Sequence, residues 1–267
     1  MESPIQPIKA IVQQAGKLLL EYFAHTDLEA SYKADHTLVT EADLAADELI
    51  SNAIRKQFPG DSILSEEIEE SHLRLAAGGA PIWVVDPLDG TTNFSLGLHF
   101  WGILVARLVD GKPESAVLHF PLLHETYTAQ HSQGAYLNGV PIHVSAPDPS
   151  RPSAFFTCCS RTYRRYKVSV PYKARILGSA GYSFCSVARG MALVGFEATP
   201  KIWDIAAGWL LVEEAGGVVR SYGKDHPFPL HPELDYGKKS FPTVIAASEQ
   251  LAERTIQQIL PREKEPK

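Results

Sequence analysis

The segment that decides most about this chain reads Ile82-Trp83-Val84-Val85-Asp86-Pro87-Leu88-Asp89-Gly90-Thr91-Thr92-Asn93-Phe94-Ser95. Its apolar start is typical of a short buried strand, and two carboxylates three positions apart follow where that strand breaks into a turn. Pro87 removes one backbone N–H and fixes φ, and Gly90 permits a tight backbone path past a ligand. A buried pair of carboxylates is too costly without a cation. The segment therefore indicates either a divalent metal site or a solvated Asp-Gly turn.

Length and composition narrow the class of protein. With 267 residues the chain can form a substantial core, as one large domain or two packed halves. A net charge of -6 argues against nucleic-acid binding. No apolar run approaches the roughly 18 residues that span a bilayer, and the N-terminus does not resemble a signal peptide. The three cysteines form no Cys-x-x-Cys and fit reduced thiols. We expect a cytoplasmic protein that binds neither nucleic acid nor membranes.

Apolar spacing and turn residues predict an alternation of helices and strands. A capping box formed by Thr40 and Asp43 marks the start of the second helix, and Asp110-Gly111 predicts a hairpin turn. Helices are expected at 5–23, 41–58, 181–189, 204–215 and 249–260, and strands at 62–65, 82–85, 100–109, 114–120, 125–130, 134–139, 155–157, 174–177, 193–196 and 243–247. A loop is expected at 69–80 and a frayed tail from Pro261. This order indicates a mixed α/β (α+β) protein with layered sheets covered by helices, not a parallel nucleotide-binding unit.

Further carboxylates could converge on the Asp86–Asp89 turn. Glu66 and Glu67 end a short strand, and if that strand lies beside the one before Asp86, the four carboxylates meet at one sheet edge. Alone, the Glu pair could equally be a solvated turn. Asp204 precedes a long apolar helix, where it can act as the N-cap, as a metal ligand or as both.

The donor types select the chemistry. Carboxylates, carbonyls and waters favour hard cations such as Mg²⁺ or Mn²⁺ over Zn²⁺, and no His stands in a zinc-ligand spacing with a Cys. Paired Mg²⁺ ions stabilise in-line displacement at phosphorus, so phosphate-ester hydrolysis follows more naturally than redox or acyl chemistry. The run from Gly178 to Gly181 could present helix N–H groups to an anion, or could simply be a tight strand–helix turn.

Several motifs together resemble the inositol monophosphatase family, from about Ile8 to Leu260. These are Val39-Thr40-Glu41-Ala42-Asp43, Ser65-Glu66-Glu67, the segment from Trp83 to Phe94, and Trp203-Asp204 with Glu214-Ala215-Gly216-Gly217. The resemblance implies a layered αβαβα sandwich forming a single catalytic domain over 1–267. Its N-terminal half, about 1–150, would carry most metal-binding carboxylates, and its C-terminal half, about 151–260, Asp204 and substrate contacts. It also implies a lithium-sensitive, Mg²⁺-dependent homodimer.

The resemblance further implies roles for single residues. Glu66, Asp86 and the Leu88 carbonyl would bind one Mg²⁺, and Asp86, Asp89 and Asp204 a second. Glu66 would also help to bind a third Mg²⁺, and Mn²⁺ could replace Mg²⁺ in these sites. Thr91, paired with Glu66 or Glu67, would orient the attacking water, so Glu66, Asp86 and Thr91 are the expected catalytic residues. Asp43 matches an acidic family position near the site. The expected substrate contacts are Asp89, Gly90, Thr91, Gly178, Ser179, Ala180, Glu197 and Asp204.

The expected function is Mg²⁺-dependent hydrolysis of inositol monophosphate or a related sugar phosphate by an activated water. The alternatives are a fructose-1,6-bisphosphatase, a nucleotide 3′-phosphatase, or a catalytically lapsed interaction protein. The complete set of carboxylates speaks against the last. The basic segment from Arg161 to Lys173 is either a solvated loop or an aid for a more anionic substrate such as a bisphosphate.

Overall fold

A computed structural model describes residues 4–24, 30–32, 38–68, 80–147 and 154–262 of the chain. Most of the predicted loop 69–80 and most of the tail lie outside these ranges. No helix within them is long and apolar enough to cross a bilayer.

The larger of two main sheets has seven strands in the order β3-β4-β5-β6-β7-β8-β9. Only β3 and β4 run parallel, and the other neighbours are antiparallel. Asp110 and Gly111 both have positive φ and join β5 to β6, which confirms the predicted hairpin turn. The bounds are β3 Ser62–Ser65, β4 Ile82–Asp89, β5 Gly102–Val109, β6 Lys112–Phe120, β7 Glu125–Gln130, β8 Gly134–Leu137 and β9 Val140–Pro141.

The second sheet has five strands in the order β12-β10-β13-β15-β14 and mixes parallel and antiparallel pairs. Its strands are β10 Phe155–Cys158, β12 Lys173–Arg175, β13 Ala192–Glu197, β14 Val218–Ser221 and β15 Thr243–Ala246. Two small antiparallel pairs join β1 (Ala30–Tyr32) to β2 (Leu38–Thr40) and β11 (Tyr166–Val168) to β16 (Ile259–Pro261).

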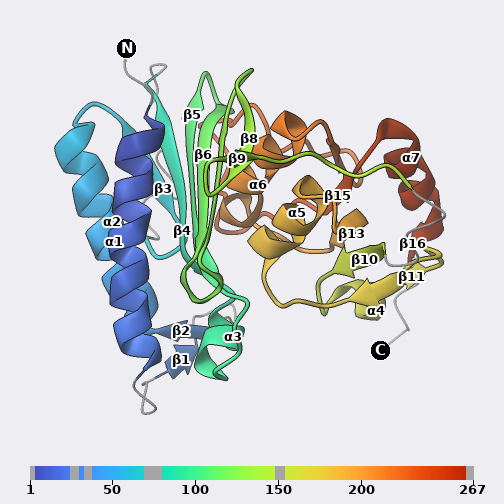
Figure 1. Cartoon of the computed structure of the whole chain (residues 1–267), viewed down its shortest axis with the longest axis horizontal. Helices are drawn as coiled ribbons and strands as arrows, with labels where there is room; N and C mark the ends of the chain where they lie inside the picture. The colour runs from blue at the N-terminus through green and yellow to red at the C-terminus, as the bar shows by residue number, and fades with distance from the viewer. Residues whose placement is uncertain (1–3, 25–29, 33–37, 69–79, 148–153, 263–267) are drawn as a thin grey trace.

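Helices and sheets alternate in five layers (Figure 1). Helices α1 (Ile5–Phe23) and α2 (Glu41–Gln57) cover one face of the large sheet. Helices α5 (Ala180–Ala188) and α6 (Ile202–Glu214) lie between the sheets, and α7 (Glu249–Gln258) packs on the small sheet. The described residues also contain the short helices α3 (Thr91–Ser95) and α4 (Thr162–Arg165) and a 3-10 helix, η2 (Pro121–Leu123). The predicted αβαβα sandwich is confirmed.

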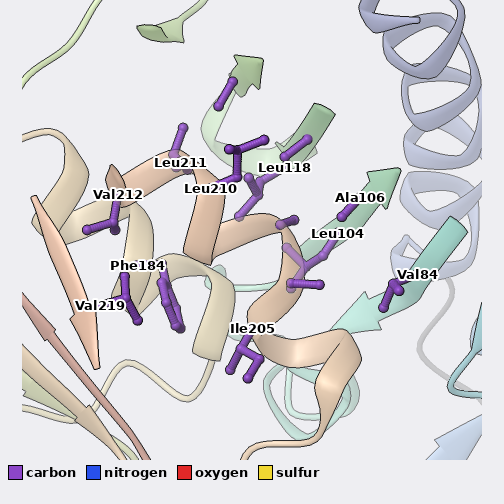
Figure 2. Packing of buried hydrophobic residues seen from close by; sticks show 14 of the residues in the cluster. Val84, Leu104, Ala106, Leu118, Phe184, Ile205, Leu210, Leu211, Val212 and Val219 are labelled. Atoms are coloured by element: carbon purple, nitrogen blue, oxygen red, sulfur yellow. The ribbon is translucent and has the colours of Figure 1, made fainter. Parts of the chain in front are cut away.

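Strand β4 is buried at every residue, and its first half, from Ile82 to Val85, is apolar because both faces of the strand are covered. Trp83 and Val85 pack towards α1 and α2, whereas Val84 packs towards α6. Figure 2 shows Val84 and Leu104 of the sheet and Ile205 of α6 as members of one apolar cluster. Two of the three apolar clusters in the described residues therefore hold β4 between the layers of helices.

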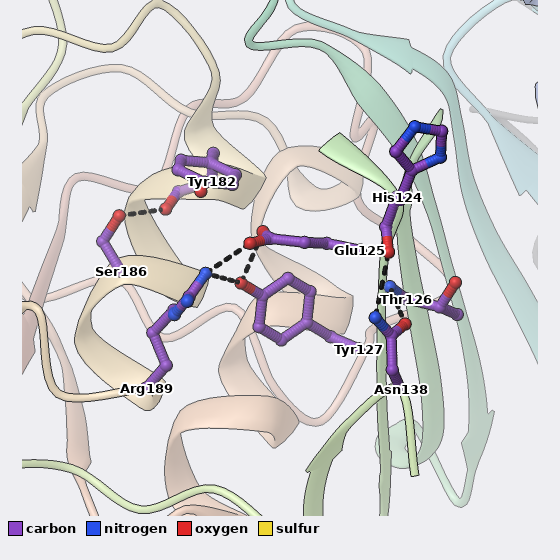
Figure 3. Close-up of polar contacts among 8 residues, drawn as sticks. All are labelled: His124, Glu125, Thr126, Tyr127, Asn138, Tyr182, Ser186 and Arg189. Atoms are coloured by element: carbon purple, nitrogen blue, oxygen red, sulfur yellow. Dashed lines mark hydrogen bonds and ion pairs between the residues drawn. The ribbon is translucent and has the colours of Figure 1, made fainter. Parts of the chain in front are cut away.

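One polar network crosses the interface between β7 and α5 (Figure 3). Arg189 Nη1 donates to Glu125 Oε1 and, at 3.0 Å, to Tyr127 Oη. Tyr127 Oη donates in turn to Glu125 Oε2 at 2.8 Å. Burial raises the pKa of the Tyr127 phenol far above its usual range, so the ring stays a neutral donor.

Most predicted elements are confirmed within a few residues, but three differences matter. Strand β4 does not end at Val85 and continues with an irregular register against β5 to Asp89. Helix α6 begins at Ile202, so Asp204 is its third residue and not its N-cap. The C-terminal segment is not frayed as far as Arg262, because β16 pairs with β11 and Arg262 N donates to Arg165 O at 2.8 Å.

Candidate active site

The carboxyl ends of β3 and β4 bring the first acidic residues together. Ser65 pairs with Val85 in the parallel register, and Glu66 N donates to Val85 O at 3.1 Å. Glu66 therefore leaves β3 beside Asp86, as the sequence predicted. Pro87 sits in the irregular step between Asp86 and Asp89, where a missing N–H is tolerated.

Asp204 reaches the same place from the second half of the chain. One oxygen of each of Glu66, Asp86 and Asp204 lies within 4.8 Å of the other two. Asp204 Oδ2 accepts the Lys201 N–H at 2.7 Å, which fixes the side chain at the start of α6 and leaves Oδ1 for another partner. Asp86 Oδ1 accepts the Leu88 N–H at 3.1 Å.

Charge in this three-carboxylate cluster is strongly unfavourable without a cation. Burial raises the pKa of the Asp86 carboxyl well above its usual range, and the charges of Glu66 and Asp89 raise it further. Burial also raises the pKa of the Asp204 carboxyl well above its usual range, and the charge of Glu66 is the second cause. Oxygen donors alone form the cluster, which is the ligand chemistry of Mg²⁺ and Mn²⁺. The residues present fit a hard divalent cation.

Asp89 is next to the cluster but is engaged by α5. It accepts from Ser179 Oγ, from Ala180 N at 3.0 Å and from Gly181 N at 2.8 Å. The helix amides that the sequence suggested for a free anion thus bind a carboxylate of the protein, because a helix N-terminus favours negative charge. Burial raises the pKa of Asp89 to about 6, although these hydrogen bonds lower it.

Thr91 has a different partner from the one expected. Its Oγ1 lies 3.0 Å from Asp43 Oδ1 and 3.1 Å from Leu88 O, so its single proton serves these acceptors instead of Glu66 or Glu67. Asp43 Oδ2 accepts the Thr40 N–H at 2.8 Å within the predicted capping box. The capping box therefore presents the second oxygen of Asp43 to Thr91.

Glu197 ends β13 on a second wall of the site and is 4% exposed. Burial raises its pKa to about 8, while hydrogen bonds from Ser183 and Cys159 lower it. Glu197 and Asp204 line one cavity together with Gly178, Ser179 and Ala180. Burial at this position thus favours the protonated form of the Glu197 carboxyl.

Asn93, which no sequence motif marked as a site residue, links the two halves of the site. Its Nδ2 donates to Phe100 O at 2.6 Å and to Leu177 O at 2.8 Å. A Cβ at Gly178, where φ is +78°, would lie 2.6 Å from Asn93 Oδ1. Its place between Thr92 and Phe94 gave no signal of a contact across 84 residues.

All the predicted metal residues line one open cleft of about 580 Å³. Its walls include Glu66, Asp86, Leu88, Asp89, Gly90, Thr91, Gly178 and Asp204. The Glu197 cavity adjoins it through Asp89, Gly178 and Asp204, which line both. The structure therefore brings every predicted site residue to two connected hollows.

Residues 2–262 match the sequence profile of the inositol monophosphatase family. The chain belongs to the inositol monophosphatase family. It is 35% identical over 234 residues to a histidinol-phosphatase of Chlorobaculum parvum, covering 83% of this chain and 87% of that protein. It is 32% identical over 219 residues to an inositol monophosphatase of Mesembryanthemum crystallinum, covering 78% and 81%.

Solved structures of the family agree with the fold. The extragenic suppressor protein suhB from Bartonella henselae superposes with a TM-score of 0.77 at 27% identity, covering 96% of this chain and 98% of that one. The relatives carry names for different phosphate esters, so family membership fixes a phosphatase but not its substrate.

Proposed function

We propose that this chain is a Mg²⁺-dependent phosphomonoesterase that hydrolyses inositol monophosphate or a related sugar phosphate. The cluster of buried Asp86 with half-buried Glu66 and Asp204 carries the proposal, since like-charged carboxylates this close need a divalent cation. In the wider family, substrates range at least from inositol phosphate to histidinol phosphate, to judge from the relatives' names.

The residues that would hold Mg²⁺, or Mn²⁺ in its place, are those around the cluster. Glu66, Asp86 and the Leu88 carbonyl would take one ion, and Asp86, Asp89 and Asp204 a second, with Glu66 assisting a third. A bound divalent ion supplies Lewis-acid activation of water and neutralises charge on the phosphate. Asp89 would contribute a lone pair that α5 leaves free, since each carboxylate oxygen can accept twice.

The chain's own groups then orient the reaction. Thr91 Oγ1, whose hydroxyl donates to Asp43 Oδ1, would accept a hydrogen bond from the attacking water and relay a proton from it towards that carboxylate. The water oxygen bonds to phosphorus, the ester P–O bond breaks, and the alcohol leaves with the proton from water. Gly90 and Thr91 would give N–H groups to the phosphate, and Glu197, with Gly178, Ser179 and Ala180, would contact the sugar.

Phosphate release by the purified chain tests this proposal. The panel is inositol 1-phosphate, histidinol phosphate, fructose 1,6-bisphosphate and a nucleoside 3′-phosphate, each with EDTA, Mg²⁺, Mn²⁺, or Mg²⁺ plus Li⁺. We expect release that requires Mg²⁺ or Mn²⁺ and falls with Li⁺. A folded protein that hydrolyses none of them with either metal would favour the lapsed interaction protein instead.

Three further properties belong to the same proposal. We expect residues 1–267 to act as one catalytic domain, because the cleft draws Asp86 from the first half and Asp204 from the second. We also expect a cytoplasmic homodimer, as the family resemblance implies. Light scattering of the purified chain tests the dimer, and fractionation of expressing cells tests its location.

A further inference from the structure

Three arginines stand within one turn of chain beside the carboxylate cleft. Arg161 directly precedes α4, and Arg164 and Arg165 end it. Arg164 and Arg165 follow Arg161 by three and four residues, a helical spacing that places all three on one side of the turn. All three side chains are exposed, and together they line a hollow of their own. Arg161 and Arg165 also line the cleft that contains the carboxylate cluster.

None of these arginines forms an ion pair with a carboxylate in the part of the chain that the structure describes. Arg161 Nη1 donates to a neutral partner, Thr199 Oγ1, at 3.0 Å. Elsewhere, by contrast, Arg189 and Arg220 pair with Glu125 and Glu249. Three neighbouring guanidinium groups without a counter-charge repel one another and attract an anion.

We propose that Arg161, Arg164 and Arg165 form a second anion subsite, which binds a phosphate group of the substrate remote from the one that is hydrolysed. The preferred substrates are then bisphosphorylated sugars or polyols. This inference rests on the proposed phosphatase function and specifies its substrate class.

Chemistry and space both support a second phosphate. A guanidinium group donates two parallel hydrogen bonds to phosphate oxygens, which makes arginine suited to this ligand. The carboxylate cluster has the opposite charge and holds an anion only through cations, so the two regions of the cleft bind by different means. The cleft volume of about 580 Å³ lies in the range of sites for small molecules.

Matched substrates test the subsite. The pairs are inositol 1-phosphate with inositol 1,4-bisphosphate, and fructose 1-phosphate with fructose 1,6-bisphosphate. We expect kcat/KM to favour at least one bisphosphate over its monophosphate by about tenfold or more, the effect of a charge-assisted hydrogen-bond pair. In an Arg164→Gln/Arg165→Gln protein this ratio should fall towards one, chiefly through KM for the bisphosphate.

A Lys167→Gln/Lys173→Gln protein is the matched control. It loses the same charge from exposed positions of the same basic segment that do not line the cleft, and we expect it to keep the wild-type ratio. Three results would overturn the proposed subsite. Wild type could prefer neither bisphosphate, the preference could survive in the arginine variant, or the lysine control could lose it equally. Hydrolysis of no substrate at all would instead refute the proposed function.

Discussion

Replacing Asp86 by Asn should stabilise the metal-free protein while removing its activity. Asp86 is 1% exposed and faces Glu66 and Asp204 within 4.8 Å. At an effective dielectric constant of about 20, each such pair of charges repels by about 3.5 kcal/mol. The native protein avoids most of this repulsion by holding protons, so we expect a gain of about 1–3 kcal/mol in the free energy of unfolding in EDTA at pH 8. Asn keeps the oxygen that accepts the Leu88 N–H.

The sign of the pH dependence follows from the raised pKa values. Folding raises the pKa of Asp86 and Asp204 well above 3.8, that of Asp89 to about 6 and that of Glu197 to about 8. The folded state therefore binds more protons than the unfolded state between about pH 4 and 8, and stability of the metal-free protein falls as the pH rises through this window. Asp86→Asn should flatten that fall.

Thermal unfolding with and without Mg²⁺ measures both effects. Each kcal/mol corresponds to about 2–4 °C in Tm for a chain of this size. Wild type should gain stability from Mg²⁺, and more at pH 8 than at pH 5, whereas Asp86→Asn should gain little. Asp225→Asn is the control, because this exposed carboxylate should change stability by less than about 0.5 kcal/mol. An Asp86→Asn protein that is less stable than wild type in EDTA at pH 8, or that responds fully to Mg²⁺, would refute the reasoning.

Three other substitutions probe the site and its support. Thr91→Val removes only the hydroxyl, and we expect phosphate release to slow about 100-fold with an unchanged Mg²⁺ effect on Tm; an unaltered kcat would exclude a role for that hydroxyl. Arg189→Ala leaves Glu125 partly buried without its cation and should cost about 2–4 kcal/mol, most of it recovered by adding Glu125→Gln; denaturant titration decides, and no recovery would contradict the pairing. Gly181→Ala would place a Cβ 2.5 Å from a core leucine carbon and should lower both Tm and activity, whereas Gly60→Ala, with nothing within 4 Å, should change neither.

The sequence predicted the parts of the site that local patterns determine. An apolar run ending in a carboxylate marks both β3 and β4, and their pairing placed Glu66 beside Asp86. The capping box at Thr40 was equally visible, because its two residues are three apart. Of the roles left open for Asp204, only the N-cap is wrong, because α6 begins two residues earlier and Asp204 accepts the Lys201 N–H from the third position. An Asp in the first turn of a helix can occupy either position, so the sequence did not distinguish them.

Contacts between distant segments could not be predicted in this way. The bond from Thr91 to Asp43 spans 48 residues, and the bonds from α5 to Asp89 span about 90. In both cases a local role, in a turn or at the start of a helix, already accounted for the residue type, so no sequence pattern indicated the distant contact. Six short strands, β1, β2, β9, β11, β14 and β16, were missed for a related reason, because two to four residues are too few to show an alternating pattern.

The hydrogen bonds that position Asp89 in the site also join the large sheet to the layer of α5 and α6. Asp89 at the end of β4 accepts three donors from α5, and Asn93 four residues later donates to Leu177 just before it. Any change that loosens α5 from the large sheet must therefore move Asp89 relative to Asp86. A residue at 89 without oxygen acceptors would leave the α5 amides unpaired and would weaken the junction. The oxygens of Asp89 thus join the layers through hydrogen bonds, whereas the charge of Asp86 is unfavourable in the metal-free fold. The response of Tm to Mg²⁺ therefore reports on the charge of the site and not on the junction.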